Sequence, residues 1–336
     1  MADFEDLKMA VEALSGGKNT VILDETDMPS IVVPFPKIYY SDVIKGGAQE
    51  VLPAFIVDGQ EKAAIYISKY ENVILNNRAY SLALKTPAAN VNFARAVEVC
   101  TNKGAGWHLT TNAAWAAIVL QSRANGFVPH GNTDNGKDYT YTDESGVGDT
   151  VTATGSGPLT WYHNHDLAGI ADLVGNLREW VSGLRLVNGE IQVIPYGNAM
   201  KYDCNMGVNS THWKAISSGG VFVEPGTADT LKMYEADSRI CVSNPKTVKA
   251  GTGAAAFGML TAADGFTPPA LLTALGLFPD GFDCAGGVTI NTDGEFLPCR
   301  GGNYADMGHA GPFALDVDNT RATANAGIGF RAAYYK

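Results

Sequence analysis

A chain of 336 residues, of which 46% are hydrophobic and 18% charged, is long enough to bury a substantial core. Its formal net charge of −11 repels phosphate backbones, and no Lys/Arg stripe with interleaved aromatics is present, so we expect no nucleic-acid binding. No apolar run reaches the roughly 20 residues of a membrane-spanning helix, and the start Met1–Asp6 lacks the features of a signal peptide. We therefore expect synthesis in the cytoplasm without a signal peptide, and no membrane insertion.

The first 50 residues differ from the rest in their pattern of predicted elements. Residues 3–15 have the pattern of an amphipathic helix, and strand-like runs follow at 31–33 and 37–40. The apolar residues on one face of this helix are Phe4, Leu7, Val11 and Leu14. We interpret residues 1–50 as a small module for assembly or attachment; an extension packed on the main domain is the alternative.

Residues 51–336 have the pattern of a mixed domain. Strands are predicted at 54–57 and 64–68. One helix is predicted from its cap at Asn92 to Gly104, a second from Thr111 or Asn112 to Gly126, and a third over 268–275.

Two turns stand out in this domain. The Asn188–Gly189 pair between two apolar runs predicts a β-hairpin over 184–194, and 127–160 read as loop, with a Gly/Asn turn at 131–136. Early helices followed by short strands in long loops indicate an α+β fold.

Few residues form a pattern that carries chemistry. His163 and His165 could share a metal if they lay on one strand, but no third ligand stands at a diagnostic spacing, so two polar loop histidines are the preferred interpretation. The cysteines are odd in number and contain no Cys-x-x-Cys pair, which favours buried thiols over zinc or disulfides. They are Cys100, Cys204, Cys241, Cys284 and Cys299. The sequence predicts no catalytic residue, metal or cofactor.

The last 37 residues have the most distinctive composition. Arg300–Gly302 and Gly327–Arg331 bracket an interior rich in Tyr, His, Asn, Asp, Thr and Met. Such side chains make contacts, whereas few of them build a core. Small polar residues and Tyr also dominate antibody paratopes, where loops on a rigid support bind a partner.

Several motifs in chain order resemble the formylglycine-generating-enzyme branch of the C-type lectin fold. The resemblance covers about residues 60–336 and includes these segments: Tyr66–Glu71, Val91–Phe93, Trp107–Trp115, Gly175–Trp180, Arg300–Gly302 and Gly329–Arg331. That enzyme binds copper through two cysteines after the Arg-Gly-Gly motif, but residues 303–336 contain no Cys, and Cys299 precedes Arg300. Because Cu(I) needs such thiolates, we expect no oxidase activity and no enzyme.

The whole layout is more similar to the variable proteins of diversity-generating retroelements, which include phage tail-tip receptor-binding proteins. In that family a reverse transcriptase alters adenines in a C-terminal repeat, so that Asn codons become codons for many residues. Tyr304, Ala305, Asp306, Gly308 and His309 fit this set, whereas Met307 requires a different template codon. The resemblance implies a C-type lectin fold over residues 51–336, with a variable region at about 300–331.

The function implied is recognition of a bacterial surface protein or glycan by a phage tail component, with other virion proteins bound through residues 1–50. The sequence leaves open a homo-oligomer, a metal-dependent enzyme of the same fold and a purely structural virion protein. Residues assigned to the rigid frame are Arg300, Gly301, Gly302, Phe313, Leu315, Ile328, Phe330 and Arg331. Residues assigned to ligand binding are Asn303, Tyr304, Ala305, Asp306, Met307, Gly308, His309, Asp316, Asp318, Asn319, Thr320 and Thr323.

Overall fold

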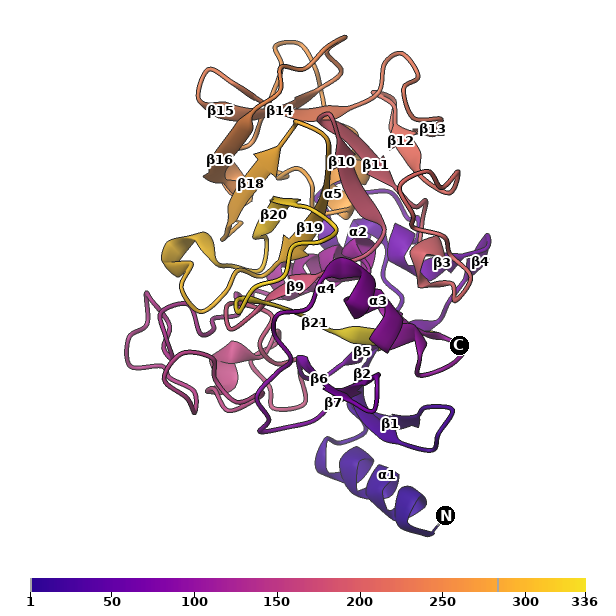
Figure 1. Ribbon diagram of the computed structural model, residues 1–336, viewed down its shortest axis with the longest axis vertical. Coiled ribbons are helices and arrows are strands. Elements are labelled where there is room, and N and C mark those ends of the chain that lie inside the picture. The colour runs from indigo at the N-terminus through magenta and orange to yellow at the C-terminus, as the bar shows by residue number, and fades with distance from the viewer. Residues whose placement is uncertain (1, 283) are drawn as a thin grey trace.

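A computed structural model describes residues 2–282 and 284–336, and shows the expected mixture of helices and strands (Figure 1). The helices are α1 (Ala2–Leu14), α2 (Tyr40–Val43), α3 (Phe93–Thr101), α4 (Asn112–Ala124) and α5 (Ala270–Ala274). Within the described ranges no helix is both long and apolar enough to cross a bilayer. The α+β class predicted from the sequence is confirmed.

A five-stranded sheet joins the two ends of the chain. Its order is β1 (Thr20–Leu23), β2 (Pro29–Pro36), β5 (Ala64–Ser68), β22 (Ala332–Tyr334) and β8 (Trp107–Leu109). The β2 strand pairs antiparallel with β5 from Val32 opposite Ser68 to Pro36 opposite Ala64. The C-terminal strand β22 lies between β5 and β8, so the end of the chain is held in the middle of a sheet.

A larger sheet contains thirteen strands of the described chain. Its main path runs β16 (Thr252–Ala256), β18 (Gly287–Asn291), β20 (Leu315–Asn319), β19 (Glu295–Arg300), β10 (Leu184–Val187), β11 (Glu190–Val193), β14 (Lys232–Ala236), β15 (Arg239–Ser243) and β17 (Thr261–Ala262). The remaining strands are β9 (Arg178–Trp180), β12 (Lys214–Ile216), β13 (Phe222–Val223) and β21 (Ile328–Phe330). Because β16 also contacts β14 and β15, the sheet curls back on itself, as the upper part of Figure 1 shows.

Two small hairpins complete the strands, β3 (Ile56–Val57) with β4 (Gln60–Glu61), and β6 (Asn72–Leu75) with β7 (Arg78–Ser81). The larger apolar core lies between α4 and the big sheet, and contains Trp115, Leu186 and Ile191. A second core packs α3 against Trp107, Trp180 and Phe330.

Local signals in the sequence place several elements correctly. Asn92 caps α3 by accepting a hydrogen bond from Arg95 N at 2.9 Å, and Thr111 caps α4 through Ala114 N at 3.0 Å. The β10–β11 hairpin turns at Asn188 and Gly189, both in the left-handed region with φ of 50° and 81°, as an Asn-Gly turn requires.

Two strand predictions are wrong in part. Residues 53–55 form a short 3₁₀ turn before β3, because Pro53 cannot donate to a strand ladder. Residues 37–40 are not a strand; only Tyr39 makes an isolated bridge, to Val51, before α2 begins at Tyr40. The predicted third helix is shorter than expected, Ala270–Ala274.

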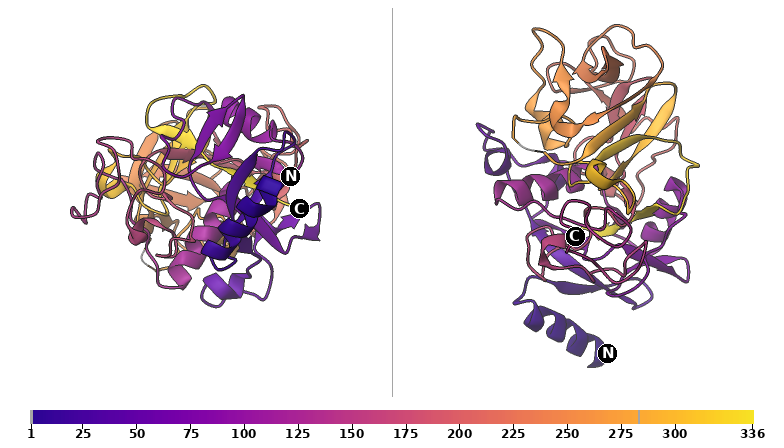
Figure 2. Two further views of the ribbon diagram at one scale, coloured as in Figure 1. Left: turned by 90° about the horizontal axis from the view of Figure 1, so that it is seen from below. Right: turned by 90° about the vertical axis from the view of Figure 1, so that its left-hand side faces the viewer.

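The N-terminal 50 residues divide into two parts. The strands β1 and β2 belong to the five-stranded sheet, and Val33, Phe35 and Ile38 pack in the main core. In contrast, α1 lies at one end of the molecule, beyond β1 (Figures 1 and 2). Its apolar stripe is only half covered, since Leu14 is 91% exposed and Leu7 40% exposed.

Candidate binding surface

The frame residues of the C-terminal segment are buried. The Arg300 side chain donates from Nε and Nη2 to Asn112 Oδ1 at 3.0 and 2.6 Å, and from Nη2 to the Gly276 carbonyl. The other frame side chains, Phe313, Leu315, Ile328 and Phe330, are at most 3% exposed. The residues that the sequence assigned to the rigid frame are therefore buried, as a supporting role requires.

Arg331 is the most completely enclosed charge of this frame. It is paired with Glu179 at 2.6 Å, and both side chains are at most 1% exposed. Its remaining N–H groups donate to the carbonyls of Ser68, Lys69, Ala171 and Asp172. Burial raises the pKa of Glu179, while the charge of Arg331 opposes that rise. The guanidinium of Arg331, in the Gly329–Arg331 motif, thus joins β5, β9 and the 171–172 turn.

Asn176 links two further motifs of the sequence resemblance. Its Nδ2 donates to Glu71 Oε2 at 2.5 Å, and its Oδ1 accepts from Asn132 Nδ2 and Thr152 N. The backbone of Asn176 has φ of 55°, a left-handed conformation that Asn adopts more readily than most residues. The turn before β9 therefore holds the 132–152 loop in place.

Arg178, at the start of β9, joins the two halves of the predicted contact segment. Its Nε and Nη2 bind both oxygens of Asp306 at 2.8 and 2.6 Å, and its Nη1 binds Asp316 Oδ2 at 2.6 Å. Asp306 Oδ2 also accepts from Asn303 N at 2.7 Å. One arginine thus fixes the 303–309 turn against the start of β20.

Asp316 is the titratable group of this cluster with the largest shift. Burial and, to a lesser degree, a hydrogen bond with Asp318 raise its pKa, the charge of Arg178 opposes that rise, and together these effects bring the pKa to about 7. Its Oδ1 is buried and has no hydrogen-bond partner among the described residues. The carboxyl group therefore titrates in the physiological range.

Solvent exposure divides the predicted ligand-binding residues into three groups. The exposed ones are Ala305, Met307, Gly308, His309, Asp318 and Thr320. The half-buried ones are Asn303, Tyr304, Asp306, Asp316 and Thr323. Asn319 is buried, and its Nδ2 lies 3.4 Å from the Asp316 carbonyl, so it is not free to contact a partner. Asp306 and Asp316 are ion-paired with Arg178, so their carboxylates hold the surface together from below and are not free to contact a partner.

Met307 is held in an unusual conformation. Its φ is 51°, which costs an unbranched side chain about 1 kcal/mol, and the side chain is 48% exposed. Its backbone N–H donates to the Thr133 carbonyl at 2.9 Å, which helps to hold the strained turn. Strain that presents an apolar side chain to solvent is typical of a functional position.

The 303–309 turn lies against the 133–141 loop, which the sequence did not assign to the site. Asn135 N donates to the Tyr304 carbonyl at 2.7 Å, and Tyr139 N donates to Thr133 Oγ1 at 2.9 Å. Tyr139 Cε1 lies 4.0 Å from where a Cβ on Gly308 would stand. This loop is otherwise polar but contains two tyrosines, Tyr139 and Tyr141, both of which are half-exposed. They were the sequence feature that could have assigned the loop to the binding surface.

The predicted turn at the base of this loop is present. Asn132 Oδ1 accepts from Gly136 N at 2.7 Å, closing the turn. Tyr141 stacks on His130 with ring centroids 3.9 Å apart, and His130 Nδ1 lies 3.0 Å from Glu144 Oε2. The loop is thus organised by its own side chains.

Thr320 and Thr323 lie apart from this surface. Cys299 is opposite Asp316 and Leu297 is opposite Asn319, so these threonines follow the far end of β20. At roughly 3.3 Å per residue the two ends of the strand are about 13 Å apart. Their hydroxyls bond to each other at 3.1 Å. The structure therefore brings together 303–309 and Asp316, but not the 320–323 turn.

The two histidines considered for a metal do not converge. His163 is buried and its Nδ1 accepts from Ile170 N at 2.8 Å, while burial lowers its pKa to about 4. His165 lies on Phe127, and its Nε2 is 3.2 Å from the Val128 carbonyl. Among residues 2–282 and 284–336 no three His, Cys, Asp or Glu side chains are grouped as metal ligands.

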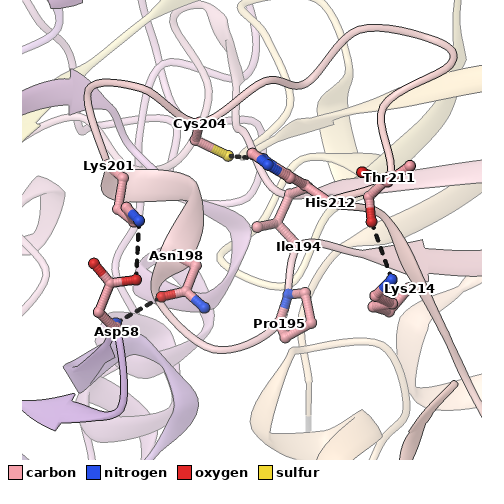
Figure 3. A pocket seen from close by; sticks show the side chains of 9 residues that line it. All are labelled: Asp58, Ile194, Pro195, Asn198, Lys201, Cys204, Thr211, His212 and Lys214. Atoms are coloured by element: carbon pink, nitrogen blue, oxygen red, sulfur yellow. Dashed lines mark hydrogen bonds and ion pairs between the residues drawn. The ribbon is translucent and has the colours of Figure 1, made fainter.

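A separate pocket lies beside the β3–β4 hairpin (Figure 3). Cys204 Sγ faces His212 Nδ1 at 3.8 Å, and Lys201 pairs with Asp58 at 2.9 Å. Burial raises the pKa of the Cys204 thiol to about 11, so the thiol is protonated at neutral pH. His212 Nδ1 already accepts from Asn205 N at 3.2 Å. This geometry does not provide an activated nucleophile.

Comparison with known proteins found similar solved structures, but no family model and no curated protein matches the chain. Treponema denticola variable protein 1 is similar in structure at 10% identity, over 95% of this chain and 99% of that chain, with a TM-score of 0.37. The Major Tropism Determinant P3c variant follows at 11% identity, over 94% and 71%, with a TM-score of 0.33.

The I1 variant of the same determinant is similar at 12% identity, over 91% of this chain and 63% of that chain, with a TM-score of 0.33. These names, variable protein and tropism determinant, belong to the class that the sequence resemblance indicates.

Proposed function

We propose that this chain is a non-enzymatic binding protein with a C-type lectin fold, and that its C-terminal surface recognises a bacterial surface receptor. The observation that carries the proposal is the contrast between the buried arginines, Arg300 and Arg331, and the exposed turn of Met307, Gly308 and His309. A turn that is fixed at its base can change its exposed side chains without loss of the fold.

The proposed contact residues are fewer than the sequence alone suggested. They are Tyr304, Ala305, Met307, Gly308, His309 and Asp318. Asp306 and Asp316 hold the surface through Arg178. Variation by a retroelement would change the exposed positions, and sequencing of the flanking DNA tests it. A near-copy of codons 300–331 beside a reverse transcriptase gene is the expected result.

A phage tail location completes the proposal. The exposed apolar residues Leu7 and Leu14 on α1, at one end of the molecule, support attachment to another virion protein or to a second copy. Several copies on one tail would strengthen weak individual contacts by multivalency.

Binding to bacterial cells tests the function. The fluorescently labelled chain is titrated against a panel of strains, together with the variant Met307→Ala/His309→Ala. Tyr202→Ala is the matched control, because Tyr202 is 64% exposed and its neighbours Lys201 and Cys204 line the pocket of Figure 3. Loss of cell binding in the double variant alone is expected; equal binding by all three proteins contradicts the proposal.

A further inference from the structure

The binding surface continues beyond the C-terminal segment onto the neighbouring loop. Two backbone hydrogen bonds join them, Asn135 N to the Tyr304 carbonyl at 2.7 Å and Met307 N to the Thr133 carbonyl at 2.9 Å. Since each loop satisfies the other's backbone groups, the two loops present one surface rather than two independent ones.

Tyr139 is the side chain of the loop that lies next to the turn. It is 49% exposed, and its Cε1 is 4.0 Å from the position of a Cβ on Gly308. Met307, in the same turn, is 48% exposed. An exposed tyrosine and an exposed methionine on adjoining loops give an apolar centre of the kind enriched at protein interfaces.

The wider segment that contains this loop is acidic. Residues 127–160 carry Asp134, Asp138, Asp143, Glu144 and Asp149 against the single base Lys137. Asp143 and Asp149 are exposed, and so is Asp318 on β20. The whole chain is acidic as well, with a net charge of −11. This charge favours a basic partner and disfavours anionic glycans and phosphate-rich polymers.

We propose that loop 133–141 forms the second half of the binding surface, with Tyr139 as its anchor, and that the partner is a polypeptide bearing Lys or Arg beside apolar side chains. This inference rests on the proposed function and adds the class of partner. Tyr139 lies outside the 300–331 region, so it supplies a constant contact while exposed residues of the turn set specificity.

The test uses a displayed library of random peptides selected on the immobilised full-length chain. Single enriched peptides are then labelled and titrated by fluorescence anisotropy at low and high salt. We expect enrichment of Lys or Arg with apolar residues, and affinity that weakens as salt increases. Tyr139→Ala should weaken binding about tenfold or more, as truncation of a central aromatic does. Tyr202→Ala should not change it.

Each other outcome has a distinct meaning. Peptides that lose affinity in Met307→Ala/His309→Ala but not in Tyr139→Ala would confine the surface to the C-terminal segment and leave the proposed function standing. Peptides unaffected by both variants would overturn the inference and the proposed site together. Selection of peptides without basic residues, or Tyr139-dependent binding on a glycan array instead of to peptides, would overturn the class of partner.

Discussion

Arg178 and Asp306 form a two-point ion pair, with Nε to Oδ2 at 2.8 Å and Nη2 to Oδ1 at 2.6 Å. The third N–H group of the same guanidinium binds Asp316. This fork geometry, which lysine cannot reproduce, fixes the base of the exposed turn.

Replacing Arg178 should therefore destabilise the chain. In Arg178→Met the carboxylates of Asp306 and Asp316, which are 16% and 14% exposed, lose their counter-charge. Because breaking a mostly buried pair leaves charges without a partner, we expect a loss of about 2–4 kcal/mol in the free energy of unfolding, measured in urea. Lys214→Met, which breaks an exposed pair with Glu224, should cost under about 1 kcal/mol. Equal losses in the two variants would show that the Arg178 cluster does not hold the turn.

The raised pKa of Asp316 makes stability depend on pH. Its pKa is about 7 in the folded chain against 3.8 in its ordinary state. The folded chain thus binds this proton more tightly than the unfolded chain. The stabilisation is complete below pH 3.8 and is lost as pH rises through about 7.

Urea unfolding of Asp316→Asn across this range measures the effect. The variant should lose less stability between pH 4 and pH 7 than the parent chain, by about 1 kcal/mol or more. Some slope should remain, since burial also raises the pKa of Asp172, to about 6. Thr320→Ala, which removes no titratable group, should follow the parent, and an unchanged slope in Asp316→Asn would contradict the assignment.

Two glycines of the C-terminal segment should differ in tolerance. Gly301 has φ of 86°, and a Cβ there would lie 2.7 Å from the Leu173 carbonyl oxygen. Gly301→Ala should cost about 2 kcal/mol or more, because strain and a backbone clash add. Gly308 is exposed, and a Cβ there meets only Tyr139 at 4.0 Å.

Gly308→Ala should change stability by less than about 0.5 kcal/mol, as is usual at the surface. Thermal unfolding of both variants measures the difference. Similar melting temperatures for the two would remove the distinction between the frame and the exposed turn.

The positive φ of Met307 should destabilise the fold, whereas its exposed side chain should contribute to binding. Replacing it with Gly removes the strain of a positive φ, so Met307→Gly should raise the free energy of unfolding by about 0.5–1 kcal/mol. The same change removes a half-exposed apolar side chain and should weaken binding to cells. Met307→Leu keeps the strain and the apolar surface and should resemble the parent. A less stable Met307→Gly chain would show that the turn is not strained.

Much of this fold was accessible from local sequence signals. Asn92 and Thr111 cap their helices because a side-chain oxygen meets a free N–H, and Asn188–Gly189 turns a hairpin because both residues accept positive φ. The frame of Arg300 and Arg331 was also predicted, and both are buried.

The contacts between distant loops were not accessible in the same way. Nothing near Arg178 in the sequence indicates that Asp306, 128 residues later, is its partner. Asp306 and Asp316 look like surface residues because charge usually means exposure, and only the fold shows that one arginine neutralises both. Tyr139 was missed for a related reason, since its place beside Gly308 depends on hydrogen bonds between two loops.

Saturation mutagenesis of the C-terminal segment tests the central claim most directly, with folding and cell binding measured for every variant. The claim is that a rigid frame carries an exchangeable binding surface. Substitutions at Ala305, Gly308 and His309 should leave stability nearly unchanged and alter which strains are bound, whereas those at Arg300, Gly301 and Arg331 should destabilise or abolish the fold. Loss of folding at the first set, or unaltered strain binding throughout it, would contradict the claim.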